Sequence, residues 1–143
     1  EAETEAADIA EATEEPTADE AEEKVVQCAW DEADALFDMG QYAEAAQAYD
    51  ALGDHEKMLL STYKQAEKQA EAGKYRSAAE LYMSIADYAD SRERHYQAGV
   101  LARENDELAD ACAIFGEDIE YGDSVEALYQ TGIIASKAQN YAV

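Results

Sequence analysis

Four aromatic residues at a constant spacing of 33 are the residues best placed for chemistry, and that chemistry is noncovalent binding. Aromatic side chains offer a large contact area at a modest cost in conformational entropy, so a row of them can hold an extended peptide. Carboxylates nearby would select basic side chains in that peptide. The candidate ligand-binding residues are therefore Trp30, Tyr63, Tyr96 and Tyr129, together with Asp34, Glu67, Glu71 and Glu104.

Combinations of residues that would indicate catalysis or metal binding are missing from the sequence. His55 and His95 are isolated, and we expect His95 at the surface or its boundary. Cys28 and Cys112 have no metal-ligand spacing, so we expect two small buried apolar side chains rather than a disulfide. Residues 118–123 come nearest to a calcium loop but lack its remaining ligands. We expect no enzymatic activity, no catalytic residues, no cofactor and no dedicated metal site.

The charge balance excludes several classes of partner. The chain has 34 acidic and 10 basic residues and a formal net charge of −24. It would repel nucleic acids and anionic membrane surfaces, whereas a basic protein or peptide is compatible with it. No apolar run approaches the roughly 20 residues that cross a bilayer. The compartment stays open between the cytoplasm and the soluble part of a membrane-anchored or exported bacterial protein.

An internal repeat positions the candidate residues. The pattern Gly-x-Tyr-x-x-Ala-Ala-x-x-Tyr occupies residues 40–49 and recurs at 73–82. At 106–115 the glycine is lost, but the small and large positions hold, as Asp-x-Leu-x-x-Ala-Cys-x-x-Phe. The small residues Ala33, Ala66, Gly99 and Gly132 share the same step. Several registers thus agree on one period, and such a period is typical of stacked helical hairpins.

The spacing inside each unit is helical. Tyr75, Ala78, Ala79 and Tyr82 fall at i, i+3, i+4 and i+7, which places them on one face of a helix. We expect tight turns at Gly40, at Gly73 and at residues 105–106. An Asp followed three residues later by Glu predicts capping boxes at residues 90–93 and 123–126. Each unit is therefore a helix, a turn and a second helix.

The repeat resembles the tetratricopeptide repeat. Its small, Gly, aromatic, Ala and aromatic positions are matched by Ala33, Gly40, Tyr42, Ala45 and Tyr49, and the same pattern follows in the next unit. The period is about 33 rather than about 34 residues. The usual Pro is absent, and the first aromatic of each unit sits one position late. The resemblance implies an all-α, right-handed solenoid of antiparallel helix pairs, with three repeats and a terminal helix, whose first helices line a groove.

The domain boundaries follow from composition and period. Residues 1–16 form an acidic segment that we expect to be disordered, and 17–143 form the repeat domain. Its predicted units are 26–58, 59–91, 92–124 and a partial 125–143. Residues 17–20 could cap a long first helix.

Two functions remain open at this stage. The leading one is a non-enzymatic binding module or scaffold that holds a peptide or protein in the helical groove, and a basic partner is compatible with its charge. The alternative is a structural protein that self-associates end to end through its incomplete last unit. The aromatic row also has an alternative placement, because a shift of one position would bury it between helices.

Overall fold

The fold is all-α, as predicted, in a computed structural model that describes residues 15–141. No strand occurs in this part of the chain. The expectation of disorder for residues 1–16 falls almost entirely outside it. The helices are α1 (Ala18–Asp38), α2 (Tyr42–Leu52), α3 (His55–Glu71), α4 (Tyr75–Ser84), α5 (Ser91–Glu104), α6 (Leu108–Glu117) and α7 (Ser124–Tyr141).

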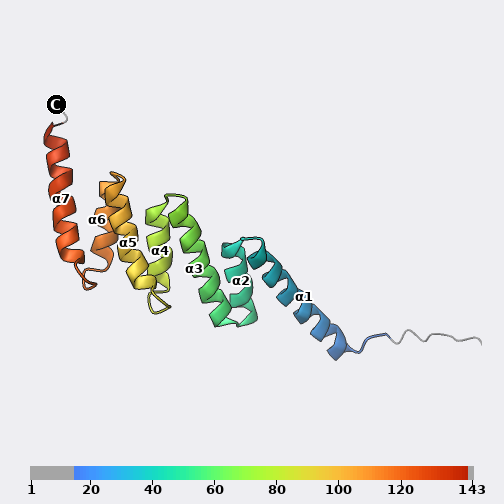
Figure 1. The fold of residues 1–143 in the computed structure, drawn as a ribbon. Coiled ribbons are helices and arrows are strands. Elements are labelled where there is room, and N and C mark those ends of the chain that lie inside the picture. Colours follow the sequence, from blue (N-terminus) through green and yellow to red (C-terminus); the bar gives the residue numbers. More distant parts are fainter. Residues whose placement is uncertain (1–14, 142–143) are drawn as a thin grey trace, which may run out of the picture.

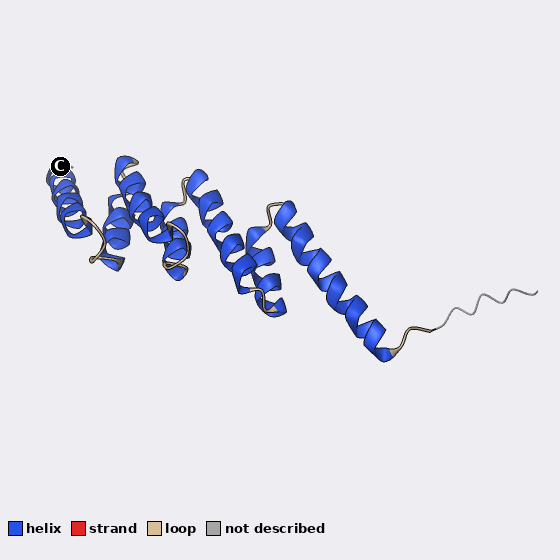
Figure 2. Cartoon of the chain, turned by 60° about the horizontal axis from the view of Figure 1, so that its bottom comes forward, coloured by secondary structure: helices blue, strands red, loops and turns tan. Residues whose placement is uncertain are grey.

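The helices follow one another in a single elongated row, joined by short loops (Figures 1 and 2). Each helix packs mainly against its neighbours in the chain, and α4 also contacts α6. Below, α1, α3, α5 and α7 are called A-type helices, and α2, α4 and α6 are called B-type helices. Among the A-type helices, α3 and α5 each pack against the preceding and the following B-type helix, whereas α1 packs against α2 and α7 against α6.

The turns between paired helices lie where the repeat predicts them. Gly40 and Gly73 have φ values of 74° and 76°, in the left-handed region that glycine adopts without strain. Asp106 takes the same place in the third unit with φ 65°. Aspartate is one of the residues that tolerate this conformation. The loss of glycine from the third repeat therefore leaves the turn intact.

Helix starts follow the sequence with two corrections. Thr17 and Glu20 form the predicted capping box, and α1 continues for 21 residues. The capping box at 90–93 is wrong, because the Asp90 side chain makes no capping hydrogen bond although α5 begins at Ser91. Its carboxylate instead accepts hydrogen bonds from Tyr63 and Arg94. The second unit also starts earlier than residue 59, since α3 begins at His55.

Small side chains let the paired helices approach closely. The pairs α1–α2 and α3–α4 each have a cluster in which buried alanines surround one large side chain of the B-type helix, and a third cluster centred on α5 and α6 extends to α4 and α7. Those large residues are Tyr49, Tyr82 and Phe115, and each is at most 3% exposed. Cys112 is half-buried, but the expected burial of Cys28 is wrong. Cys28 lies in the part of α1 that precedes its packed residues, from Trp30 onward.

Candidate functional site

Three of the four predicted aromatic residues pack between helices. Trp30, Tyr63 and Tyr96 are half-buried, and each ring contacts the aromatic ring 19 residues later, in the paired B-type helix. The ring centroids are 6.3 Å apart for Trp30–Tyr49, 5.5 Å for Tyr63–Tyr82 and 5.4 Å for Tyr96–Phe115. Among the described residues, none of the four rings packs against another of the four. This is the arrangement that the sequence left open as an alternative.

Two of these rings are also covered by a tyrosine from the following loop. Tyr63 lies 5.8 Å from Tyr88, and Tyr96 lies 5.8 Å from Tyr121. The Tyr63 hydroxyl donates a hydrogen bond of 2.5 Å to Asp90. Burial raises the pKa of Tyr63, and its hydrogen bond lowers the pKa of Asp90. Tyr63 and Tyr96 therefore tie the second and third helix pairs to the loops that follow them.

The four predicted acidic residues fall in different surroundings. Asp34 accepts hydrogen bonds from the Tyr49 hydroxyl at 2.6 Å and from Lys57 Nζ at 2.9 Å. Glu67 accepts one from Lys64 at 2.8 Å. Glu71 lines a hollow together with Glu67, and Glu104 is exposed at the end of α5. Only Asp34 is brought together with one of the predicted aromatic residues.

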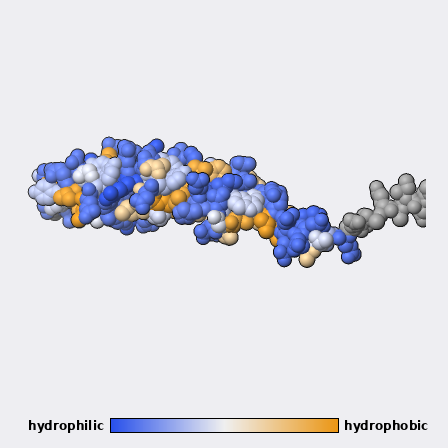
Figure 3. All heavy atoms as spheres, turned by 90° about the horizontal axis from the view of Figure 1, so that it is seen from below, coloured by the Kyte–Doolittle hydropathy of each residue, from blue (hydrophilic) through white to orange (hydrophobic). Residues whose placement is uncertain are grey.

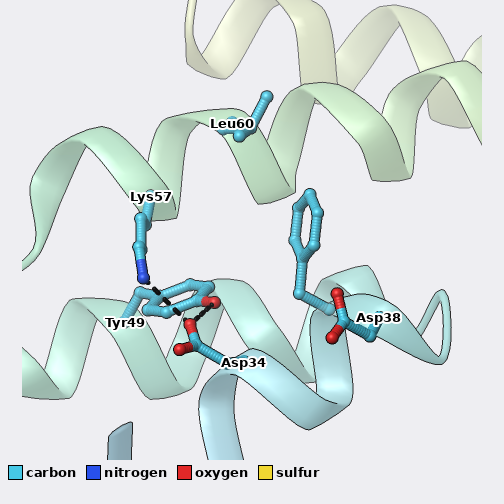
Figure 4. Close-up of a pocket in the computed structure, with 6 residues that line it drawn as sticks. Asp34, Asp38, Tyr49, Lys57 and Leu60 are labelled. Atoms are coloured by element: carbon cyan, nitrogen blue, oxygen red, sulfur yellow. Dashed lines mark hydrogen bonds and ion pairs between the residues drawn. The ribbon is translucent and has the colours of Figure 1, made fainter. Parts of the chain in front are cut away.

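Asp34, Trp30 and Tyr49 surround a single ammonium group. Lys57 Nζ lies 5.4 Å from the Trp30 ring centroid and 5.1 Å from that of Tyr49, within the range of cation–π attraction. Lys57 Nζ and the Tyr49 hydroxyl both donate hydrogen bonds to the Asp34 carboxylate, and Figure 4 draws these two bonds. The Tyr49 hydroxyl and Lys57 together lower the pKa of Asp34. Burial and Asp34 raise the pKa of Tyr49. We call Trp30, Asp34 and Tyr49 the ammonium site.

A surface hollow of about 290 Å³ opens beside the ammonium site. Its apolar lining comes from Phe37 of α1 and Leu60 of α3, and Asp38 adds a second carboxylate (Figure 4). An adjoining hollow of about 280 Å³ shares Lys57 and Leu60 and reaches Tyr88. The two hollows adjoin at Lys57 and Leu60 of α3, and we call them together the α1–α3 groove. It combines apolar contact surface with negative charge.

A separate hollow of about 380 Å³ lies on the other side of the first turn. It is lined by Gly40, Tyr42, Lys64, Glu67, Lys68 and Glu71. Its basic residues already have partners, since Lys64 pairs with Glu67 and Lys68 donates to the Gly40 carbonyl at 3.0 Å. The two lysines of this hollow are therefore already paired with groups of the same chain.

A buried polar cluster between α5 and α6 corrects another expectation. His95, predicted at the surface or its boundary, is 2% exposed. Its Nε2 lies 3.2 Å from Glu117, which also pairs with Arg76 at 2.9 Å. Next to it, Asp118 accepts two hydrogen bonds from Arg92, at 2.5 and 2.7 Å, which lower the pKa of Asp118. These contacts fix the corner after α6.

The residues that sequence reasoning missed are Phe37, Asp38, Lys57 and Leu60. None belongs to the 33-residue registers, so the repeat does not identify them. One usable signal was the spacing of Asp34, Phe37 and Asp38 at i, i+3 and i+4, which places all three on one face of α1. The ion pair between Asp34 and Lys57 depends on how the second unit packs on the first.

The face of the molecule seen in Figure 3 is mostly hydrophilic, with hydrophobic side chains gathered in patches along the row. No group of His, Cys, Asp or Glu in residues 15–141 is arranged to hold a metal ion. None of the described helices has both the length and the apolar character for a membrane span. Comparison with protein-family models, curated proteins and solved structures finds no match for this chain.

Proposed function

We propose that this chain is a non-enzymatic binding module or scaffold of the tetratricopeptide-like kind, a right-handed solenoid of antiparallel helix pairs. The 33-residue period, the positive-φ turns at Gly40 and Gly73, and the packing of each helix on its chain neighbours support this proposal. In such an array the A-type helices line a groove, and the α1–α3 groove lies between two of them.

The ammonium site is the observation that carries the proposal. One carboxylate and two aromatic rings converge on the Nζ atom of Lys57, which is the chemistry that recognises a lysine side chain. Lys57 and Asp34 side chains remain 44% and 51% exposed. A lysine from a ligand could therefore reach the same atoms by displacing an exposed side chain, without opening the core.

The form of the groove favours an extended ligand over a compact one. The hollows are shallow and adjoin each other across α3, so a ligand would lie along them. Phe37 and Leu60 offer apolar contacts between acidic positions. The net charge of −24 would speed the approach of a basic peptide and make its binding sensitive to salt. A basic peptide segment with interspersed apolar residues fits these features.

Binding of short fluorescein-labelled peptides in which lysine and leucine alternate tests this function. Fluorescence anisotropy should show binding that weakens with salt and is lost when the lysines are acetylated. Asp38→Asn and Leu60→Ser should each weaken it several-fold, whereas Asp50→Asn, at an exposed site on α2, should not. The proposal fails if no lysine peptide binds, or if Asp38→Asn and Leu60→Ser bind as tightly as the original chain.

End-to-end self-association is the second candidate, favoured by exposed apolar residues on α7. Val125, Tyr129 and Ile134 are 61%, 64% and 44% exposed. Light scattering over a wide range of concentration separates the two functions. A constant mass of 15.7 kDa supports the binding module, and growth into dimers or longer assemblies supports the structural protein.

A further inference from the structure

The ammonium site belongs to the first helix pair because two positions there depart from the repeat. Trp30 stands where the later units have tyrosine, and Lys57 stands where the next unit has Asp90. In the second pair the Tyr63 hydroxyl donates a hydrogen bond to Asp90. In the first pair an ammonium group over two aromatic rings takes the place of that bond. The departure therefore exchanges a hydrogen bond for a site that holds a cation.

The walls of the ammonium site are fixed by packing. Tyr49 is 3% exposed, and its hydroxyl orients the Asp34 carboxylate through a hydrogen bond of 2.6 Å (Figure 4). The Trp30 ring is half-buried against Tyr49 at an interplanar angle of 46°. Tryptophan also attracts cations more strongly than the other aromatic residues. The side chain of Lys57 is 44% exposed and can leave without disturbing these walls.

An unmodified ligand lysine gains little at the ammonium site itself. It would displace Lys57 by an identical ammonium group, so the contacts that form equal the contacts that are lost. Lys57 also belongs to the same chain, which gives it a high effective concentration at the site. A ligand gains from the exchange only if the site holds its cation better than it holds an unmodified ammonium group.

The site offers fewer hydrogen-bond acceptors than an ammonium group has donors. A lysine ammonium has three N–H groups. Within residues 15–141, Lys57 Nζ donates a hydrogen bond to Asp34 alone. The rings of Trp30 and Tyr49 attract its charge but replace water poorly as acceptors. Methyl groups facing the rings would keep the charge, remove unpaired donors and add apolar contact.

We propose that the ammonium site selects a lysine that carries one or two methyl groups. This inference rests on the proposed function, because the methylated side chain is presented by a peptide in the α1–α3 groove. The remaining N–H donates a hydrogen bond to Asp34, and the methyl groups lie against Trp30 and Tyr49. A third methyl group removes the last N–H, and acetylation removes the charge.

The test uses one fluorescein-labelled peptide of alternating lysine and leucine in four forms. Its lysines are unmodified, dimethylated, trimethylated or acetylated. The first two forms carry the same charge, so their general attraction to the acidic chain is matched. Anisotropy with the full chain should show binding about threefold tighter or more for the dimethylated form, the size of one exposed cation–π contact. The trimethylated form should bind more weakly than the dimethylated form, and the acetylated form should not bind.

Trp30→Leu should abolish the preference for dimethyllysine, because it removes one aromatic wall and keeps an apolar side chain. Both forms should then bind equally through the rest of the α1–α3 groove. Tyr121→Leu is the matched control, since it removes a half-buried ring outside the groove that also lies near a cation, 5.5 Å from Arg92. This variant should keep the preference. Circular dichroism checks that each variant is folded.

Equal binding of the unmodified and dimethylated forms overturns the inference but leaves the proposed function standing, since the peptide still binds. Absence of binding by every form overturns both. A preference that persists in folded Trp30→Leu also overturns the inference, because methylation would then act through general hydrophobicity. Tightest binding of the trimethylated form overturns the hydrogen bond to Asp34. Loss of the preference in Trp30→Leu with retention in Tyr121→Leu supports the inference.

Free Nα-acetyl-dimethyllysine amide separates a peptide ligand from a small molecule. If the α1–α3 groove contributes to binding, the free compound should compete with the dimethylated peptide only at much higher concentration. Leu60→Ser should weaken binding of the dimethylated peptide and leave that of the free compound unchanged. Competition by the free compound at the concentration of the peptide would assign the site to a small methylated amine and overturn the inference.

Discussion

Gly99 and Gly132 occupy the same position in successive A-type helices but meet opposite surroundings. Gly99 lies against the Phe115 ring, whereas Gly132 faces open space on the described part of the molecule. Glycine thus allows close helix packing at Gly99, whereas no neighbouring helix of the described chain packs against Gly132. This difference leads to a direct prediction for stability.

Gly99→Ala should destabilise the fold, and Gly132→Ala should stabilise it. Alanine is favoured over glycine within a helix by roughly 0.5–1 kcal/mol. At Gly99 this gain is outweighed by the overlap with Phe115, since overpacking a core costs about 1–3 kcal/mol. Urea unfolding followed by circular dichroism measures both. Equal effects of the two substitutions would contradict the difference in packing.

The contribution of Asp118 to stability should vanish in acid. Hydrogen bonds from Arg92 hold the folded-state pKa of Asp118 below its ordinary value of 3.8. A carboxylate with a lowered pKa stabilises the fold above its unfolded pKa, and this stability is lost as the pH falls through the folded value. Asp118→Asn should therefore be less stable than the original chain at pH 7.

The gap in unfolding free energy between the two chains should begin to narrow below about pH 4, where Asp118 of the unfolded chain takes up a proton, and should close as the pH falls through the lower pKa of folded Asp118. Urea unfolding of each chain across this range measures it. The comparison also removes the general effect of acid on a chain with 34 acidic residues, which both chains share. A gap that stays constant down to pH 2 would show that the ion pair does not contribute in this way.

Lys57→Met should raise the affinity for lysine peptides. The side chain of Lys57 competes with a ligand for Asp34 and for the faces of Trp30 and Tyr49. Methionine keeps apolar contact area but leaves the carboxylate free. Lys64→Met, which removes the partner of Glu67 in the other hollow, is the matched control. Peptide anisotropy with weaker or unchanged binding in Lys57→Met would argue against the ammonium site as the ligand site.

The repeat predicted the backbone better than the side-chain partners. The φ values at Gly40, Gly73 and Asp106 follow directly from residue spacing, because turn and helix preferences are local. Asp90 had the right spacing for a capping box, but its carboxylate instead accepts a hydrogen bond from the Tyr63 hydroxyl. That contact joins residues 27 positions apart, and a local pattern carries no information about it.

The candidate site was predicted only in part. Asp34 and Trp30 do lie together, yet the rings expected to form a continuous row are divided among the helix pairs. In the sequence, the first aromatic residue of each unit sits one position late, and this shift accounts for the placement of the rings between helices. Lys57 and Leu60 enter the site because α3 packs against α2, and their positions depend on that packing.

The most direct test of the account is an NMR titration of the isotope-labelled full chain with a lysine peptide. If the α1–α3 groove is the binding site, amide shifts should concentrate at Asp34, Phe37, Asp38, Lys57 and Leu60 and extend to Tyr88, while α6 and α7 stay unchanged. Shifts confined to α6 and α7, or scattered over all acidic surfaces, would contradict the assignment of this groove as the site of peptide binding.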